Sequence, residues 1–437
     1  MTPYVTLVVK ELADIFSSRT ALLMAIIISF VFGYSFYSAV SLYANASTAA
    51  VDNPLYAAGF EPVPGVFVPT FGGLFIIFSF FLPFLFIPLI STERRNNTLT
   101  ILMQLPYSLG GILTVKTLAA AAYLLFIFLL SLPSLVLWKL WGGHIPAVEL
   151  LLVVGEYFCY GLLIIAISLF ASALFTSTAS ASILAIAIVI ASWLIDFGRE
   201  MNIAPLLVSL SEWSVTKNLK SFEEGLLAIR TVMYLISLTS AFFAAAYFLL
   251  RFDLKNRWQP LTVVLVVSLI AVIGVSRIDL SYDLSESNRN SFPPKIVQYL
   301  QKIPSLDIDI YLERTDSRFK DYEKSFLKKL LMVKPDTRVV MASGEALKQN
   351  YGRFVYRIDD KADTTYSNSD EEIFQVIFKL SGISHEESMT EKEYPGYPLV
   401  TSVSQQNSII YLYFALLPLL IAGVFTITRM SKRGKLR

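Results

Sequence analysis

Long apolar stretches alternate with short polar ones along most of this chain. A helix needs about 20 apolar residues to cross a bilayer, because its backbone amides must be paired within the segment. Eight stretches meet this requirement: residues 21–42, 71–90, 117–138, 150–175, 180–195, 231–250, 259–276 and 408–428. The count of eight depends on accepting residues 180–195, the shortest of them. The pattern predicts an all-α polytopic membrane protein with about eight transmembrane helices.

Composition supports this prediction and excludes several classes of protein. Of 437 residues, 55% are hydrophobic and only 16% are charged, which is typical of a chain whose main solvent is lipid. The net charge of +2 gives no indication of nucleic-acid binding. Cys159 is the only cysteine, which excludes internal disulfides and a cysteine-built zinc site. Charged residues precede the first apolar run, so we expect an uncleaved first span rather than a signal peptide.

The basic residues between the predicted spans indicate the orientation of the chain. With an even number of spans, the basic clusters fall on one side: Lys10 and Arg19; Arg94, Arg95 and Lys116; Arg251, Lys255 and Arg257; and Arg429, Lys432, Arg433, Lys435 and Arg437. The positive-inside rule identifies this side as cytoplasmic. We therefore expect a plasma (inner) membrane protein with both termini in the cytoplasm and a basic tail at 429–437.

The segment at residues 277–407 has the composition of a water-soluble domain. It holds 18 of the chain's 36 basic and 21 of its 34 acidic residues. Apolar and polar residues alternate over 306–312, the pattern of a half-buried strand. We expect further strands at 338–342 and 353–358, helices at 293–303, 317–332 and 371–380, and a linker at 383–405. The order predicts an extracytoplasmic α/β domain inserted before the last helix.

Residues 3–18 precede the first span and have helical periodicity. Tyr4, Val8, Leu12 and Ile15 fall on one stripe, with polar residues opposite. This predicts an amphipathic helix in the cytoplasmic interface, over residues 1–19. A simple helical lead-in to the first span fits the same periodicity.

The loop between the second and third predicted spans combines charged, apolar and helix-ending residues. From residue 91 it reads Ser-Thr-Glu-Arg-Arg-Asn-Asn-Thr-Leu-Thr-Ile-Leu-Met-Gln-Leu-Pro-Tyr-Ser, and Lys116 opens the next span. Charged residues 93–95 are predicted to begin a short helix that stops near Pro106, because proline cannot continue it. The alternative is a chance helix in a positively charged loop.

This order resembles the coupling loop of type 2 ABC exporter permeases. In that family an acidic residue, a Thr-Leu pair, a Leu-rich helix, a Pro-x-Ser stop and a Lys follow one another. The resemblance implies docking in a groove on a separate ATPase, whose closure the segment transmits. The matching residues are Glu93, Arg94, Thr98, Leu99, Leu102 and Pro106. Asn97 stands where the family usually has glycine, which predicts a differently shaped turn.

A second match lies before the sixth span. Asn218-Leu-Lys-Ser-Phe-Glu-Glu-Gly225, followed by Arg230 and Tyr234, resembles the segment that follows two short re-entrant helices in the same permeases. Residues 196–215 fit such a pair of helices. The resemblance implies a six-span permease core over residues 20–250, with a seventh span at 259–276 and an eighth at 408–428.

Three residues are candidates for a substrate pathway: Glu156, Asp196 and Gly225. Glu156 is the one acidic residue inside the predicted spans, and buried ionisable groups in membranes often line a pathway. It also lies near the outer end of its span, so a solvated or tyrosine-paired carboxylate fits equally.

The start of the polar domain resembles a narrower group. Arg277-Ile-Asp-Leu-Ser281, Asp283-Leu-Ser285, then Ser291 before a helix and the strand at 306–312 look like the start of the auxiliary domain of gliding-motility-type ABC transport systems. That domain is usually longer and often on a separate chain, so this version would be fused and shortened.

The sequence has no Gly-x-x-x-x-Gly-Lys-[Ser/Thr] motif, so ATP hydrolysis is expected on a partner chain. His144 and His385 do not form a zinc-protease motif, and we expect no catalytic, cofactor or metal site. The implied partners are an ABC ATPase, a second permease core and membrane lipid, without nucleic acid. The predicted function is export of an amphiphilic substrate by a permease subunit. The alternative is a membrane-anchored receptor or cell-envelope scaffold; an intramembrane enzyme ranks last.

Overall fold

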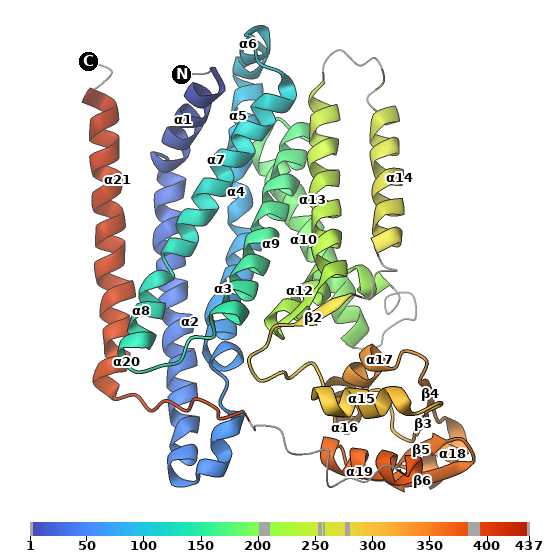
Figure 1. Ribbon diagram of the computed structural model, residues 1–437. Helices are drawn as coiled ribbons and strands as arrows, with labels where there is room; N and C mark the ends of the chain where they lie inside the picture. Colours follow the sequence, from blue (N-terminus) through green and yellow to red (C-terminus); the bar gives the residue numbers. More distant parts are fainter. Residues whose placement is uncertain are drawn as a thin grey trace. The chain divides into compact units, whose positions relative to one another are not determined.

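The apolar and the charged parts of the chain fold as two separate units (Figure 1). The structure is a computed structural model that describes residues 3–200, 210–251, 256, 258–275, 280–382 and 394–434. Unit 1 comprises Met1–Tyr282 and Pro395–Arg437, and unit 2 comprises Asp283–Tyr394. The predicted start of the polar domain at residues 277–279, and much of the predicted linker at 383–393, lie outside the described residues.

Unit 1 is a helix bundle, and eight of its described helical segments are long and apolar enough to cross a membrane. They are Arg19–Val51, Val63–Phe80, Leu109–Leu140, Ala147–Leu174, Thr178–Phe197, Ile229–Leu250, Trp258–Val275 and Val403–Ile427. The prediction of an all-α membrane protein with about eight spans and an α/β region is confirmed. Residues 180–195, the weakest predicted span, lie inside α10 (Thr178–Glu200).

The elements of unit 1 follow in chain order. They are α1 (Pro3–Phe16), α2 (Arg19–Asp52), η1 (Pro54–Gly59), η2 (Val63–Phe67), α3 (Val68–Phe80), α4 (Leu82–Phe86), α5 (Pro88–Arg95), α6 (Thr98–Gln104), α7 (Leu109–Leu129), α8 (Leu132–Leu140), α9 (Ala147–Leu174), α10, η3 (Ser211–Trp213), α12 (Val215–Glu223), β1 (Leu226–Ala228), α13 (Ile229–Leu250), α14 (Trp258–Val275), α20 (Val403–Ile410), η6 (Tyr411–Leu416) and α21 (Leu417–Gly434). The strand β2 (Ser281–Asp283) pairs with β1. Of the predicted re-entrant pair at 196–215, residues 201–209 lie outside the described residues, while 196–200 end α10 and 211–213 form η3.

Prolines divide the second and third spans into shorter helices. Pro83 and Pro88 lie in the first turns of α4 and α5, and Pro133 lies in the first turn of α8. Proline lacks an amide hydrogen and clashes with the preceding turn, so a helix interior breaks there. Backbone groups freed within a bilayer need new partners, because lipid supplies none.

Tyr413 of the last span supplies those partners at the break between α7 and α8. Its hydroxyl accepts a hydrogen bond from the Ser134 amide (3.0 Å) and donates one to the Leu130 carbonyl (3.2 Å). The Tyr413 carbonyl accepts a hydrogen bond from the Ser29 hydroxyl of α2 (2.8 Å). Gly33 of α2 faces the Tyr413 side chain so closely that a Cβ would overlap it. The last span is therefore fixed to α2 and α8 by polar contacts as well as by packing.

A short extended segment, residues 396–399, leads to the last span and also packs on unit 1. The Tyr397 amide donates to the Phe60 carbonyl (2.8 Å), and the Tyr397 carbonyl accepts from the Tyr43 hydroxyl (2.8 Å). The His144 ring stacks on the Tyr397 ring with a centroid separation of 3.7 Å. Gly396 has φ 64° and lies against the Ala57 carbonyl, where no side chain would fit. This histidine therefore has a packing role in the structure.

Unit 2 is a small α/β unit with a four-stranded mixed sheet in the order β4-β3-β5-β6. Its strands are β3 (Asp307–Ile310), β4 (Arg338–Met341), β5 (Phe354–Ile358) and β6 (Lys361–Thr365). β3 runs parallel to β4 and antiparallel to β5, which forms a hairpin with β6. Its helical elements are α15 (Pro294–Lys302), α16 (Ser317–Tyr322), η4 (Glu323–Leu327), α17 (Lys328–Val333), α18 (Gly344–Gln349) and α19 (Asp370–Ser381).

Burial alternates along β3 as the sequence predicts. Ile308 and Ile310 are fully buried, while Asp307 and Asp309 are partly exposed. The buried face of the sheet packs on aromatic residues of the helices, including Phe326 and Phe374. β6 has no alternation of apolar and polar residues and was not predicted from sequence. It is one of the two edge strands of the sheet, with β4, and pairs with a single neighbour.

Replacing Tyr413 with phenylalanine tests how the last span is fixed. Tyr413→Phe keeps the ring but removes the hydroxyl that donates to the Leu130 carbonyl, and leaves the Ser134 amide with the Ser131 carbonyl alone. Loss of a partner by a buried polar group costs about 1–3 kcal/mol. We expect lower thermal stability in detergent and faster hydrogen exchange around Ser134. Tyr411→Phe is the matched control, because Tyr411 is 72% exposed. Equal behaviour of the two variants would contradict this role of Tyr413.

Candidate functional site

The loop between the second and third spans contains the residues that the sequence singled out. α5 ends at Arg95, and α6 begins only at Thr98. The prediction that residues 93–95 begin the short helix is therefore wrong: they form the end of α5. Asn97 causes the break, because its φ of 56° and ψ of 11° are left-handed and cannot belong to an α-helix. Asparagine tolerates this conformation better than most residues, so the turn takes a shape that glycine would also favour.

α6 is a short amphipathic helix with a buried side and an exposed apolar side. Leu99 is 2% exposed, and Leu102 and Met103 pack partly against the bundle core. Ile101 and Leu105 point away, with 59% and 47% of their surface exposed. Thr98 and Pro106, at the two ends of the helix, are exposed as well. Of the predicted coupling residues, Leu99 and Leu102 hold the helix in place, and Thr98 and Pro106 lie on its surface.

A buried ion-pair cluster connects α5, α7 and α1. The Lys116 ammonium group of α7 lies 2.9 Å from a carboxylate oxygen of Glu93 and 3.0 Å from one of Glu11. The side chains of Lys116 and Glu11 are 1% and 2% exposed, and that of Glu93 is 14% exposed. The Oε2 atom of Glu93 is buried with no hydrogen-bond partner among the described residues. Glu93 is therefore held in place through its other carboxylate oxygen, which faces Lys116.

Lys10 covers the same cluster from the partly exposed side. Its ammonium group lies 2.8 Å from Glu11 and 3.4 Å from both Glu93 and Asp14. Partial burial acts to lower the pKa of Lys10, but the hydrogen bond to Glu11 and the nearby carboxylate charges outweigh it. The pKa of Lys10 is therefore held above its ordinary value, and the lysine stays charged throughout the physiological pH range.

Arg94 connects the same loop to the end of α9. Its guanidinium group donates hydrogen bonds to the carbonyl oxygens of Ser172 (2.7 Å) and Ala173 (2.6 Å). These carbonyls are in the last turn of α9, where the helix dipole is negative and carbonyls lack intrahelical partners. Glu93 and Arg94 thus attach α5 to three other helices.

The N-terminal helix α1 packs along the start of α7. Its buried stripe is Leu7, Glu11 and Ile15, with Leu12 partly buried, rather than the predicted stripe led by Tyr4. Tyr4 is instead partly exposed and contacts the loop: its hydroxyl accepts from the Ser108 amide (3.3 Å), and its ring lies edge-on to Tyr107. Gly111 leaves room for the Tyr4 ring. Glu11 was missed in the sequence analysis. It lies one helical turn from both Leu7 and Ile15, and an acidic residue on an apolar stripe indicates a buried charge that needs a partner.

The three predicted pathway residues lie on different elements around α12, which packs against both α9 and α10. Glu156 of α9 is 2% exposed, and neither carboxylate oxygen has a hydrogen-bond partner among the described residues. The neighbouring Tyr157 hydroxyl donates to Glu223 of α12 (2.6 Å), not to Glu156. Asp196 of α10 lies 3.8 Å from Lys220. Gly225 ends α12 with φ 81°, a turn that favours glycine.

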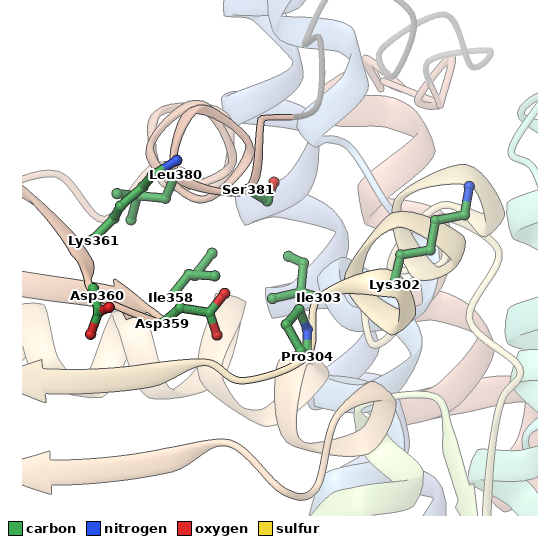
Figure 2. Close-up of a pocket in the computed structure, with 9 residues that line it drawn as sticks. All are labelled: Lys302, Ile303, Pro304, Ile358, Asp359, Asp360, Lys361, Leu380 and Ser381. Atoms are coloured by element: carbon green, nitrogen blue, oxygen red, sulfur yellow. The ribbon is translucent and has the colours of Figure 1, made fainter.

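Unit 2 contains a hollow of about 460 Å³ beside the β5–β6 hairpin (Figure 2). Lys302 and Lys361 lie at opposite ends of it, and Asp359 and Asp360 lie on the hairpin turn. The Asp359 carboxylate accepts a hydrogen bond from Ser305 (3.2 Å). The four charges balance, so the hollow does not select a ligand by its charge.

Removal of the buried ammonium group tests the ion-pair cluster. Lys116→Met leaves the carboxylates of Glu11 and Glu93 with only the half-exposed Lys10 as a cationic partner. Removing one partner of a buried ion pair typically costs 3–5 kcal/mol. We expect a lower melting temperature in detergent and loss of hydrogen-exchange protection in α1. Lys139→Met, on exposed Lys139, is the control. The triple variant Glu11→Gln, Glu93→Gln, Lys116→Met should recover part of the loss, because no charge remains buried. Equal melting of the two single variants would rule out the cluster as a source of stability.

Comparison with known proteins adds one finding. Residues 5–197 match the family model described as ABC-2 family transporter protein. The match begins in α1, includes the loop with α6, and ends near the end of α10. No curated protein and no solved structure matches the chain. The chain is thus a multi-pass membrane protein whose residues 5–197 are similar to the membrane component of ABC-2 transporters, which supports an ABC-2 type permease.

Proposed function

We propose that this chain is the permease subunit of an ABC transporter and exports an amphiphilic substrate, with a separate ATPase docked on α6. The observation that carries the proposal is the combination of the family match with an exposed apolar helix inside the matched range. Ile101 and Leu105 lie outside the candidate spans found among the described residues. Exposed apolar groups of this kind mark a protein contact.

The predicted coupling residues divide into two groups under this proposal. Thr98, Pro106, Ile101 and Leu105 form the contact surface. Glu93, Arg94, Leu99 and Leu102 attach α6 and α5 to the bundle. Glu93 contacts α7 and α1, and Arg94 contacts α9. A displacement of α6 would therefore be transmitted to three helices together. This is the arrangement that transmission of ATPase closure requires.

ATP binding biases the permease because the nucleotide has a higher affinity for the closed state of the ATPase pair. A second permease core, identical or related, would complete the substrate path between two bundles. Glu156, Asp196 and Gly225 border α12 and are candidates for the outer part of that path. Few ionisable groups lie inside the candidate spans, which favours an apolar or amphiphilic substrate.

We place the chain in the plasma (inner) membrane with both termini and α6 in the cytoplasm. The basic residues supporting this lie near the N-terminus, in the α6 loop, after α13 and in the tail. Unit 2 then lies outside the cytoplasm, as a shortened relative of the gliding-motility-type auxiliary domain. In unit 2, the Asp283 carboxylate accepts hydrogen bonds from Ser285 (2.6 Å) and Ser291 (2.8 Å), two residues of that resemblance. The small size of unit 2 suits binding of a partner protein, an envelope polymer or the departing substrate.

Co-purification with a surface variant tests the docking site. Ile101→Asp replaces an exposed side chain, so the bundle keeps its fold, and a central contact of this kind is worth at least about 2 kcal/mol. We expect wild-type protein from gently solubilised membranes to retain an ATPase with a phosphate-binding loop, and Ile101→Asp to lose it. Tyr366→Asp, an equally exposed change in unit 2, is the control. Failure to retain any ATPase under conditions that keep other partners would favour the receptor or scaffold alternative.

Labelling in oriented membrane vesicles tests the orientation. In a Cys159→Ser background, Gln104→Cys on α6 and Tyr366→Cys in unit 2 provide two exposed thiols. An impermeant maleimide should label Tyr366→Cys only in right-side-out vesicles and Gln104→Cys only in inside-out vesicles. Labelling of both thiols from one side would contradict the proposed topology.

A further inference from the structure

An apolar groove of about 310 Å³ lies in unit 1 between the last span and the first and third spans. Ala21 and Ala25 of α2 contribute from one side, Tyr123 and Phe126 of α7 from another, and Val424 of α21 from the third. Phe16, the last residue of α1, closes one end. The groove therefore lies near the N-terminal end of α2 and the C-terminal end of α21.

The groove exists because small residues face large ones. Ala21 and Ala25 are 3% and 2% exposed and leave space that a longer side chain would fill. The rings of Phe16, Tyr123 and Phe126 pack together with centroid separations of 5.4–5.8 Å. The only polar atom of these rings is the Tyr123 hydroxyl, which donates to the Ala21 carbonyl (2.6 Å). The lining offers an occupant van der Waals contact and no hydrogen bond.

Two arginines flank the groove on the same side. Arg19 comes two residues before Ala21, and Arg429 comes one helical turn after Phe425, another lining residue. Among the described residues, neither arginine has an ion-pair partner. The sequence continues with four more basic residues after Arg429, namely Lys432, Arg433, Lys435 and Arg437. Basic clusters directly on the cytoplasmic side of a span attract anionic lipid headgroups.

We propose that this groove binds one acyl chain of an anionic phospholipid of the cytoplasmic leaflet, whose phosphate is held by Arg19 and Arg429. The volume is at the lower end for small-molecule sites, which suits a single chain rather than a headgroup. An apolar groove among spans is open to lipid, and the adjacent guanidinium groups select negative charge. The choice of leaflet rests on the proposed topology; binding itself does not depend on the ATPase.

Filling the groove tests the acyl-chain site. Ala25→Phe places a ring in the space left by Ala25, and Leu23→Phe is the control, because Leu23 lies on the same helix and is 60% exposed. Each protein is placed in nanodiscs of equimolar phosphatidylglycerol and phosphatidylcholine, and lipids retained after detergent transfer are counted by native mass spectrometry. We expect wild type and Leu23→Phe to retain one phosphatidylglycerol, and Ala25→Phe to lose it.

Removal of the two charges tests the headgroup site with a variant on the surface of the bundle. In Arg19→Gln, Arg429→Gln we expect retention of one lipid without preference for phosphatidylglycerol. The preference should fall roughly 5-fold for each charge removed. A preserved preference in this variant, or equal retention by Ala25→Phe and Leu23→Phe, would overturn the proposal. So would dissociation of a dimer by Ala25→Phe, which would assign the groove to a second copy.

The same preparations separate this proposal from the proposed function. Ala25→Phe should still retain the ATPase, because the groove and α6 involve different residues. Lipid loss with ATPase retained supports the groove. If the wild type retains no ATPase and Ala25→Phe still loses the lipid, the lipid site is supported and the proposed transporter function is rejected.

Discussion

The burial of one ammonium group, Lys116, constrains the whole α6 end of the helix bundle. A charged group removed from water needs close opposite charges, and Lys116 finds them on Glu11 and Glu93, from two separate segments. α1 must therefore lie against α7, and α5 must end where Glu93 reaches the same site. Arg94 then extends the connection to the last turn of α9. The position of α6 follows from these contacts, because it continues directly from α5.

Polar contacts also fix the elements that packing alone would leave loosely attached. The last span buries little of its surface, yet the Tyr413 hydroxyl occupies the backbone break between α7 and α8. Gly396 and Tyr397 attach the segment before that span to the chain around Ala57 and Phe60. Within a span, the hydrogen bonds of Tyr413 are effective because a bilayer provides no competing water. The apolar groove lies where Ala21 and Ala25 of α2 line a space between α7 and α21.

The spans were predictable from sequence because a bilayer requires each helix to pair its own amides, so apolar length alone identifies them. The alternation in β3 identified the core of unit 2 for a similar reason. The start of α6 was misplaced because only the left-handed Asn97 shows where α5 ends. The ion-pair cluster was not predictable, since 105 positions separate Glu11 from Lys116 and no local pattern joins them. β6 was missed because an edge strand needs no apolar alternation.

Site-specific photocrosslinking in living cells tests the central claim most directly. A photoreactive amino acid at Leu105, which directly follows α6 and is 47% exposed, captures whatever protein contacts that surface. The account predicts a cross-linked partner whose sequence contains the phosphate-binding motif Gly-x-x-x-x-Gly-Lys-[Ser/Thr]. The same photoreactive residue at Tyr366 in unit 2 should not capture that partner. Capture only of proteins without this motif at Leu105 would contradict an ATPase-docking role for α6.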